Sequence, residues 1–151
     1  MPNWCYNRIT IYGDSETEAK LKEIEEIFEK ADPFNQIFPI PDFKNIPDEK
    51  GELPKLEQKL NPDGSVFYET YNFPDGTNDD RWYHWCVENW GTKWDVSELD
   101  IEYADDEQLE LTFSTAWSPP EGVIEKLRDK YPDLSFSCFY DEPGMEVAGY
   151  Y

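Results

Sequence analysis

The sequence predicts an α+β fold of the ferredoxin-like type, a split β-α-β antiparallel sheet with two helices on one face. Two stretches with helical periodicity are each preceded and followed by strand-like stretches, and an alternating hairpin separates them. Without residues 33–92 the predicted order is β-α-β-β-α-β, with one extra C-terminal strand. Such a sheet has one face covered by helices and one face free. With 151 residues and 17% aromatic side chains, residues 1–151 are expected to form a single domain that carries 33–92 as an insertion.

The first strand is predicted over residues 4–12, where aromatic and β-branched side chains predominate up to Gly13-Asp14. A helix is expected next, because Ser15 and Glu18 form a capping-box pattern. Apolar side chains then recur at helical spacing, at Leu21, Ile24, Ile27, Phe28 and Ala31. Asp32-Pro33 is expected to end this helix.

The second helix is predicted to begin with Ser118 as its N-cap and Pro119 at its first position, with Glu121 completing a capping box. Its buried stripe consists of Val123, Ile124, Leu127 and Tyr131, and Pro132 ends it. Residues 134–140 and 145–151 are predicted strands, joined by the tight-turn sequence at 141–144.

The most unusual stretch of the chain runs from Trp94 to Glu110 and holds eight carboxylates without a single Lys or Arg. The charges fall on a period of two. Leu99, Ile101 and Tyr103 alternate with Glu98, Asp100 and Glu102, and beyond residues 104–107 Leu109, Leu111 and Phe113 alternate with Gln108, Glu110 and Thr112. This alternation predicts an antiparallel hairpin whose apolar side faces the core. Its carboxylates are expected on the free face, where repulsion between like charges opposes folding.

The insertion at 33–92 contains seven of the twelve prolines, so its regular elements should be short. A helix is predicted at 53–60, a strand at 65–73 and a second helix at 80–90, entered at Asn78 or Asp79 and closed by Gly91. Four tryptophans belong to this region or border it: Trp82, Trp85, Trp90 and Trp94. Packing of these rings in the core is the favoured interpretation, and a ligand groove lined by them is the alternative.

Composition restricts the class of partner. The chain has 34 Asp and Glu against 13 Lys and Arg, a net charge of −21. Direct binding to nucleic acid or to an anionic membrane is therefore not expected, because each phosphate contact needs a cation. No apolar run is long enough to cross a bilayer and no signal peptide precedes Trp4, so a cytoplasmic location is expected. The three widely spaced cysteines fit buried thiols in a reducing compartment.

The sequence contains no decisive catalytic pattern. His84 is the only histidine, no nucleophile motif or glycine-rich phosphate loop is present, and the spacing of His84 and Cys86 is not that of a zinc site. The acidic turn at 105–107 lacks the spacing of a calcium loop. We therefore predict a protein that is not an enzyme and has no cofactor and no metal.

Four segments together resemble the YubB-type ferredoxin-like domain family, whose members are small proteins encoded mostly by phages, prophages and plasmids. They are residues 1–7 (MPNWCYN), 85–95 around ENWGTKWD, 115–120 (TAWSPP) and 140–144 (YDEPG). The resemblance implies a ferredoxin-like fold, a mobile-element origin and a bacterial host. It implies no activity and no catalytic residues.

The predicted partner-binding residues are the acidic ones of the hairpin: Glu98, Asp100, Glu102, Asp105, Asp106, Glu107 and Glu110. A rigid face of fixed negative charges suits a basic site on a host protein, in particular one that binds nucleic acid. This leads to the hypothesis of a nucleic-acid mimic that inhibits a defence or DNA-handling system.

Other interpretations remain open. The acidity can serve solubility alone, with binding done by the Trp-rich insertion. A small-molecule-binding protein or a carboxylate-dependent enzyme with a Trp-lined groove is one alternative, and a virion or assembly component is another. The oligomeric state is not predicted.

Overall fold

The computed structural model describes residues 2–151, and the chain forms two compact units. The main unit consists of the chain up to Pro39 together with Cys86–Tyr151, and the inserted unit is Ile40–Trp85. The inserted unit lies within the predicted insertion at 33–92 but is shorter, because residues 33–39 and 86–92 contribute side chains such as Phe34 and Trp90 to the core of the main unit.

The main unit is built on a five-stranded antiparallel sheet with the strand order β4-β5-β1-β6-β7. The strands are β1 (Trp4–Tyr12), β4 (Ser97–Ala104), β5 (Gln108–Ala116), β6 (Ser135–Glu142) and β7 (Val147–Tyr150). β5 lies between β1 and β4, so the first β-α-β unit is split, and β7 extends the sheet beside β6. The predicted ferredoxin-like α+β fold is confirmed.

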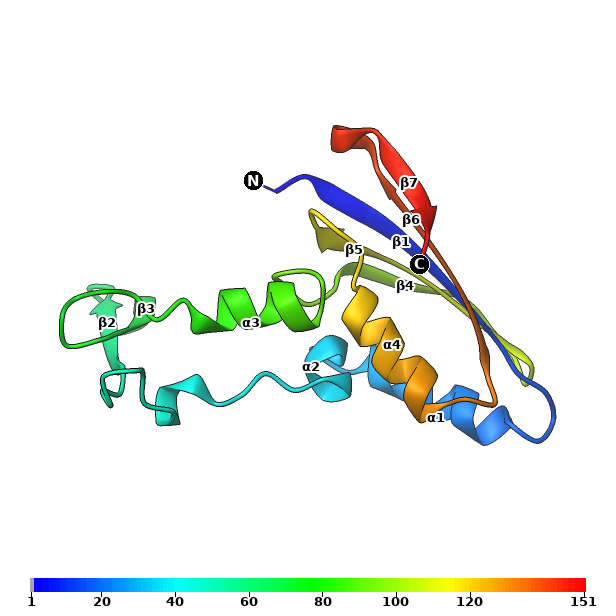
Figure 1. Cartoon of the computed structure of the whole chain (residues 1–151), viewed down its shortest axis with the longest axis horizontal. Helices are drawn as coiled ribbons and strands as arrows, with labels where there is room; N and C mark the ends of the chain where they lie inside the picture. Colours follow the sequence, from blue (N-terminus) through cyan, green and yellow to red (C-terminus); the bar gives the residue numbers. More distant parts are fainter. Residues whose placement is uncertain (1) are drawn as a thin grey trace. The chain divides into compact units, whose positions relative to one another are not determined.

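Helices α1 (Glu18–Glu29) and α4 (Glu121–Lys130) cover one face of this sheet, and the short α2 (Pro33–Ile37) lies beside them (Figure 1). Each strand directs alternate side chains to this covered face. On β1 the buried residues are Cys5, Asn7, Ile9 and Ile11, and the core partners from the helices include Leu21, Ile24, Phe28, Val123, Ile124 and Leu127. Burial of these apolar side chains is the main stabilising contribution.

The predicted helix starts are wrong in detail. At α1 the hydroxyl-containing N-cap is Thr17 rather than Ser15, and the Asp14 carboxylate accepts hydrogen bonds from the N–H groups of Glu16 and Thr17. At α4 the N-cap is Pro120, and the Ser118 hydroxyl donates to the Gly91 carbonyl oxygen instead of capping the helix. Ser118 is diverted from the cap because its hydroxyl finds a partner on a distant segment, which a local capping pattern does not take into account.

The inserted unit contains a two-stranded antiparallel sheet of β2 (Lys55–Leu60) and β3 (Val66–Asn72), a short 3₁₀ turn at Phe43–Asn45 and the beginning of α3 (Arg81–Asn89). The predicted strand at 65–73 and helix at 80–90 are confirmed. The helix predicted at 53–60 is wrong, because those residues pair with β3 as strand β2. Gly91 follows α3 with a φ of 90°, as the predicted helix end requires.

Candidate functional site

The face of the main sheet opposite α1 and α4 is the candidate site, and we call it the open face. The strand register brings side chains from all five strands together on it. Arg8 lies opposite Thr112 of β5 on one side and Phe139 of β6 on the other. Thr112 is in turn opposite Asp100 of β4, and Phe139 is opposite Tyr150 of β7.

The open face is hollowed into a cavity of about 660 Å³. It is lined by Tyr6, Asn7, Arg8, Thr10, Glu98, Asp100, Thr112, Phe113, Ser114, Ser137, Phe139, Asp141 and Tyr150. A second, shallower hollow adjoins it at Arg8 and is lined by Arg8, Glu102, Tyr103, Gln108 and Glu110. The predicted carboxylates Glu98, Asp100, Glu102 and Glu110 therefore all reach the open face.

Three carboxylates of the larger hollow, those of Glu98, Asp100 and Asp141, have no hydrogen-bond or ion-pair partner among residues 2–151. Asp141 was not among the predicted site residues, because the sequence suggests that β6 ends at Tyr140. The strand continues to Glu142, so that Asp141 follows Ser137 and Phe139 on the open face. The two-residue spacing of these three side chains is the signal that could have revealed it.

Among the described residues that line the two hollows, the one cation is Arg8, which lies outside the acidic stretch 94–110. Its Nη1 is 3.3 Å from Glu110 Oε1. Next to this pair, the Thr112 hydroxyl donates a 2.8 Å hydrogen bond to Glu102 Oε1. Glu102 and Glu110 are thus partly satisfied within the protein, whereas the carboxylates of the larger hollow are available to an external cation.

Strand β4 departs from regular alternation at two points, and both change the open face. Its register shifts between Ser97 and Asp100, where Glu98 has a φ of 52°, and again between Ile101 and Tyr103. Beyond the second bulge Tyr103 is 48% exposed, so the prediction that Tyr103 lies on the core side of the hairpin is wrong. A bulge adds one residue to a strand and inverts the faces beyond it, which is why Glu102 and Tyr103 both line the shallower hollow.

The turn between β4 and β5 carries the remaining predicted acids, Asp105, Asp106 and Glu107, which are all exposed. The N–H groups of Glu107 and Gln108 both donate to Asp105 Oδ1 at 2.8 Å. The hydroxyl of Tyr103 donates to the same carboxylate, and this hydrogen bond lowers the pKa of Asp105. Asp105 therefore stabilises the turn, while Asp106 and Glu107 extend the negative surface at the tip of the hairpin.

Aromatic side chains surround Asp141. Tyr6 is opposite it on β1, and the rings of Phe139 and Tyr150 contact each other edge to face with centroids 5.2 Å apart. Tyr6 is 52% exposed and Tyr150 is 77% exposed. Such large exposed rings beside an unpaired carboxylate are typical of a binding surface rather than of a core.

The four tryptophans of the predicted aromatic groove are divided between the two units. Trp90 is 2% exposed and packs in the core of the main unit, with its ring 5.7 Å from that of Phe34 and its indole N–H donating to the Phe38 carbonyl. Trp94 is also in the main unit. Its ring centroid is 6.4 Å from that of Trp4, and Lys93 Nζ lies 4.0 Å from the same Trp94 centroid. Trp82 and Trp85 belong to the inserted unit, so neither unit contains the four-tryptophan groove.

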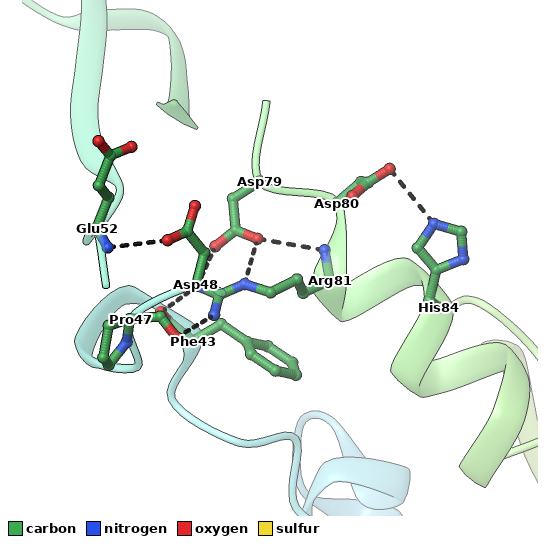
Figure 2. Close-up of polar contacts among 8 residues, drawn as sticks. All are labelled: Phe43, Pro47, Asp48, Glu52, Asp79, Asp80, Arg81 and His84. Atoms are coloured by element: carbon green, nitrogen blue, oxygen red, sulfur yellow. Dashed lines mark hydrogen bonds and ion pairs between the residues drawn. The ribbon is translucent and has the colours of Figure 1, made fainter. Parts of the chain in front are cut away.

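The polar centre of the inserted unit is Arg81 (Figure 2). Its guanidinium donates to both carboxylate oxygens of Asp79 and to the Phe43 carbonyl, and it lies within 5.2 Å of the ring centroids of Phe43 and Phe73. The hydrogen bond from Arg81 lowers the pKa of Asp79. The Nη1 of Arg81 also donates to the Pro47 carbonyl, so all three guanidinium nitrogens have acceptors in the inserted unit, which indicates a structural clamp.

His84 lies on the exposed surface of α3, with its Nε2 3.4 Å from Asp80 (Figure 2). The three cysteines, Cys5, Cys86 and Cys138, are buried free thiols whose pKa values are each raised by burial to about 11, so their thiolate forms are disfavoured. Within residues 2–151 no group of three or more His, Cys, Asp or Glu side chains is placed to hold a metal ion.

The four segments that carry the family resemblance meet at one end of the main sheet. The Trp117 N–H donates to the Asn3 carbonyl, and the Gly122 N–H that follows TAWSPP donates to Trp90. The space around Gly144 is closed by the side chains of Asn3 and Glu142. These contacts show that the four segments contribute to the architecture of the main unit. Met1 of the first segment lies outside the described residues.

The main unit is a ferredoxin-like domain, as defined by the order of its strands, its split β-α-β connection and the cover of helices on one face of its sheet. Residues 89–151 match the family model described as "Ferredoxin-like domain in Api92-like protein". The crystal structure of protein Api92 from Yersinia pseudotuberculosis is similar over 99% of this chain and 93% of that chain, with a TM-score of 0.53 and 12% sequence identity. At this identity the similarity concerns the fold alone. Among proteins with curated descriptions, none matches the sequence.

No helix within residues 2–151 combines the length and apolar character that crossing a membrane requires.

Proposed function

We propose that this protein is a binding protein, without enzymatic activity, whose open face binds a basic site on a partner protein. One observation carries the proposal: the carboxylates of Glu98, Asp100 and Asp141 surround a hollow of about 660 Å³ and have no cationic partner among the described residues. Like charges on one face repel one another, and Glu98 and Asp100 lie only two residues apart on β4, so these carboxylates oppose folding unless a ligand compensates them.

The chemistry of the hollow supports binding rather than catalysis. Among the residues that line it there is no cysteine and no histidine, and its arginine is already paired with Glu110. A general base or nucleophile would need an activating neighbour at hydrogen-bond distance. Fixed carboxylates with exposed aromatic rings instead match the side chains of Lys and Arg.

The partner that we propose is a nucleic-acid-binding protein of a bacterial host, and the place of action is the host cytoplasm. Proteins that bind DNA or RNA expose cationic sites suited to a high density of negative charge. An acidic sheet face occupying such a site would act as a nucleic-acid mimic and inhibit defence or DNA handling. The net charge of −21 and the resemblance to proteins of mobile elements support this proposal.

A charge-reversal experiment tests the proposal. The wild-type protein, the open-face variant E98K/D100K/D141K and a control variant E26K/E29K/E125K are immobilised and exposed to a bacterial lysate. The control changes three exposed helix acids, Glu26, Glu29 and Glu125, and so alters the net charge by the same amount. We expect specific proteins to bind the wild type and the control at low salt, to be lost from the open-face variant, and to be displaced by 0.5 M NaCl or by duplex DNA.

Two results would contradict the proposal. If the same proteins bind to both triple variants, the open face is not the binding surface. If the retained proteins are displaced by salt but not by duplex DNA, the partner is basic but its nucleic-acid site is not the one occupied.

A further inference from the structure

The larger hollow has two chemically different ends. At the β6 end, Asp141 is accompanied by the rings of Tyr6, Phe139 and Tyr150. At the β4 end, Glu98 and Asp100 are accompanied by the hydroxyl side chains of Thr112 and Ser114. Both ends attract cations, but the exposed aromatic rings lie at the β6 end, since Phe113 of β5 is buried.

The β6 end suits a guanidinium group. The two oxygens of a carboxylate accept two parallel hydrogen bonds from the planar fork of an arginine, and an aromatic ring stacks on the same plane. The register places Tyr6 directly opposite Asp141, and Tyr150 is exposed next to Phe139. An ammonium group would gain the charge attraction but not the stacking, because it is compact and strongly hydrated.

The distance between the two ends follows from the register. Asp100, Thr112, Arg8 and Phe139 form one row across β4, β5, β1 and β6, and Asp141 lies two residues beyond Phe139 along β6. Three strand spacings of about 4.8 Å across the sheet and two residues of about 3.3 Å along the strand place Asp100 and Asp141 roughly 16 Å apart. A single side chain does not cover this distance, but an extended segment covers it in about four to five residues at roughly 3.3 Å each.

The centre of the row disfavours a third cation. Arg8 lies between Thr112 and Phe139 in the row that begins at Asp100, it lines the hollow, and its Nη1 is 3.3 Å from Glu110 Oε1. A basic residue of the ligand in this position would meet a like charge. The ligand should therefore carry its positive charges at two separated positions.

We infer that the open face recognises an extended segment of another protein that crosses the strands and has an arginine at the Asp141 end and a second basic residue four positions away. This inference rests on the proposed function and specifies the partner's recognised element. A second copy of this chain is an unsuitable occupant, because it brings the same net charge of −21 to the same face.

Synthetic peptides test the spacing. The spaced peptide is blocked Gly-Arg-Ser-Gly-Ser-Arg-Gly, and the adjacent peptide is blocked Gly-Ser-Arg-Arg-Ser-Gly-Gly, which has the same composition and charge. Further probes replace both arginines of the spaced peptide by lysine or by neutral citrulline. Calorimetric titration of the full-length protein at low salt should give about fivefold tighter binding for the spaced than for the adjacent peptide, with the lysine peptide weaker and no binding of the citrulline peptide.

Variants locate each end. Asp141→Asn should remove the preference for arginine over lysine, whereas Asp100→Asn should weaken both peptides equally. Glu26→Gln on α1 is the control and should change nothing. Unchanged melting temperatures show that the exposed-site variants are folded.

The outcomes separate this inference from the proposed function. Equal binding of the spaced and adjacent peptides, with loss of both in E98K/D100K/D141K, supports the proposed function and overturns the extended-segment inference. Peptide binding that the open-face variant does not affect contradicts both. A dimer in light scattering that dissociates in the open-face variant would show that a second copy occupies the face and would also overturn the inference.

Discussion

At the scale of single residues, Gly122 at the start of α4 is the glycine with the least room for a Cβ atom. A Cβ atom added there would lie 1.6 Å from the Asn89 carbonyl oxygen, and the Gly122 N–H donates to the Trp90 carbonyl. Gly91, with a φ of 90°, lies against Pro119 in the same region. The two glycines allow the end of α3 and the start of α4 to pack without side chains between their backbones.

Gly122→Ala should therefore be strongly destabilising, because the added methyl group meets backbone that has no rotamer to change. We expect a loss of about 3 kcal/mol in the free energy of unfolding, measured by urea denaturation. Gly149→Ala is the matched control, since its Cβ would contact only the Tyr140 ring at 3.7 Å or more, and it should change stability by less than about 0.5 kcal/mol. Equal stability of the two variants would show that α3 and α4 separate at little cost.

At the scale of elements, strand β4 combines the site with local backbone strain. Glu98 has a φ of 52° at the first bulge, a conformation that costs a residue with a side chain about 1–2 kcal/mol. The same residue supplies one of the unpaired carboxylates of the hollow. Strain of this kind is often found at functional sites, where the geometry serves binding at the expense of stability.

Two variants separate the strain of Glu98 from its charge. Glu98→Gln and Glu98→Gly both remove the carboxylate, but only glycine tolerates the positive φ without strain. We expect the glycine variant to be more stable than the glutamine variant by about 1 kcal/mol in urea denaturation, and both to bind the spaced peptide more weakly than the wild type. A glutamine variant as stable as the glycine variant would mean that the bulge is not strained.

At the scale of the whole molecule, negative charge outweighs positive charge, with 34 acids against 13 basic residues. Self-repulsion of this size favours the expanded unfolded chain, and dissolved salt screens it. The unpaired carboxylates of Glu98, Asp100 and Asp141 contribute to this repulsion on the open face of the folded sheet.

Stability should consequently rise with ionic strength. Between 20 and 500 mM NaCl we expect the wild-type melting temperature to increase by about 3 °C, which corresponds to roughly 1 kcal/mol for a chain of this size. The open-face variant E98K/D100K/D141K should show the smallest increase, and the control E26K/E29K/E125K an intermediate one. A wild-type melting temperature that does not change with salt would show that the charges are too well solvated to affect folding.

For most elements, the sequence by itself determined whether the element is a helix or a strand and which of its side chains face the core. The stripe of Val123, Ile124 and Leu127 and the alternation in β1 and β5 depend on local periodicity, which is set by the geometry of the helix and the strand. The sequence also located the acidic hairpin and the end of α3 at Gly91, because both features are encoded by residues that are adjacent in the chain.

The tertiary structure alone decided the composition of the site. Arg8 and Asp141 join the acids of β4 because strand register brings together residues that are far apart in the chain: Arg8 is 92 positions and Asp141 is 41 positions from Asp100. The bulges that expose Tyr103 and strain Glu98, the pairing of residues 55–60 as a strand, and the diversion of Ser118 from its cap also depend on distant partners. Local patterns indicate which face a side chain occupies, but its neighbours on that face are fixed by long-range hydrogen bonding and packing.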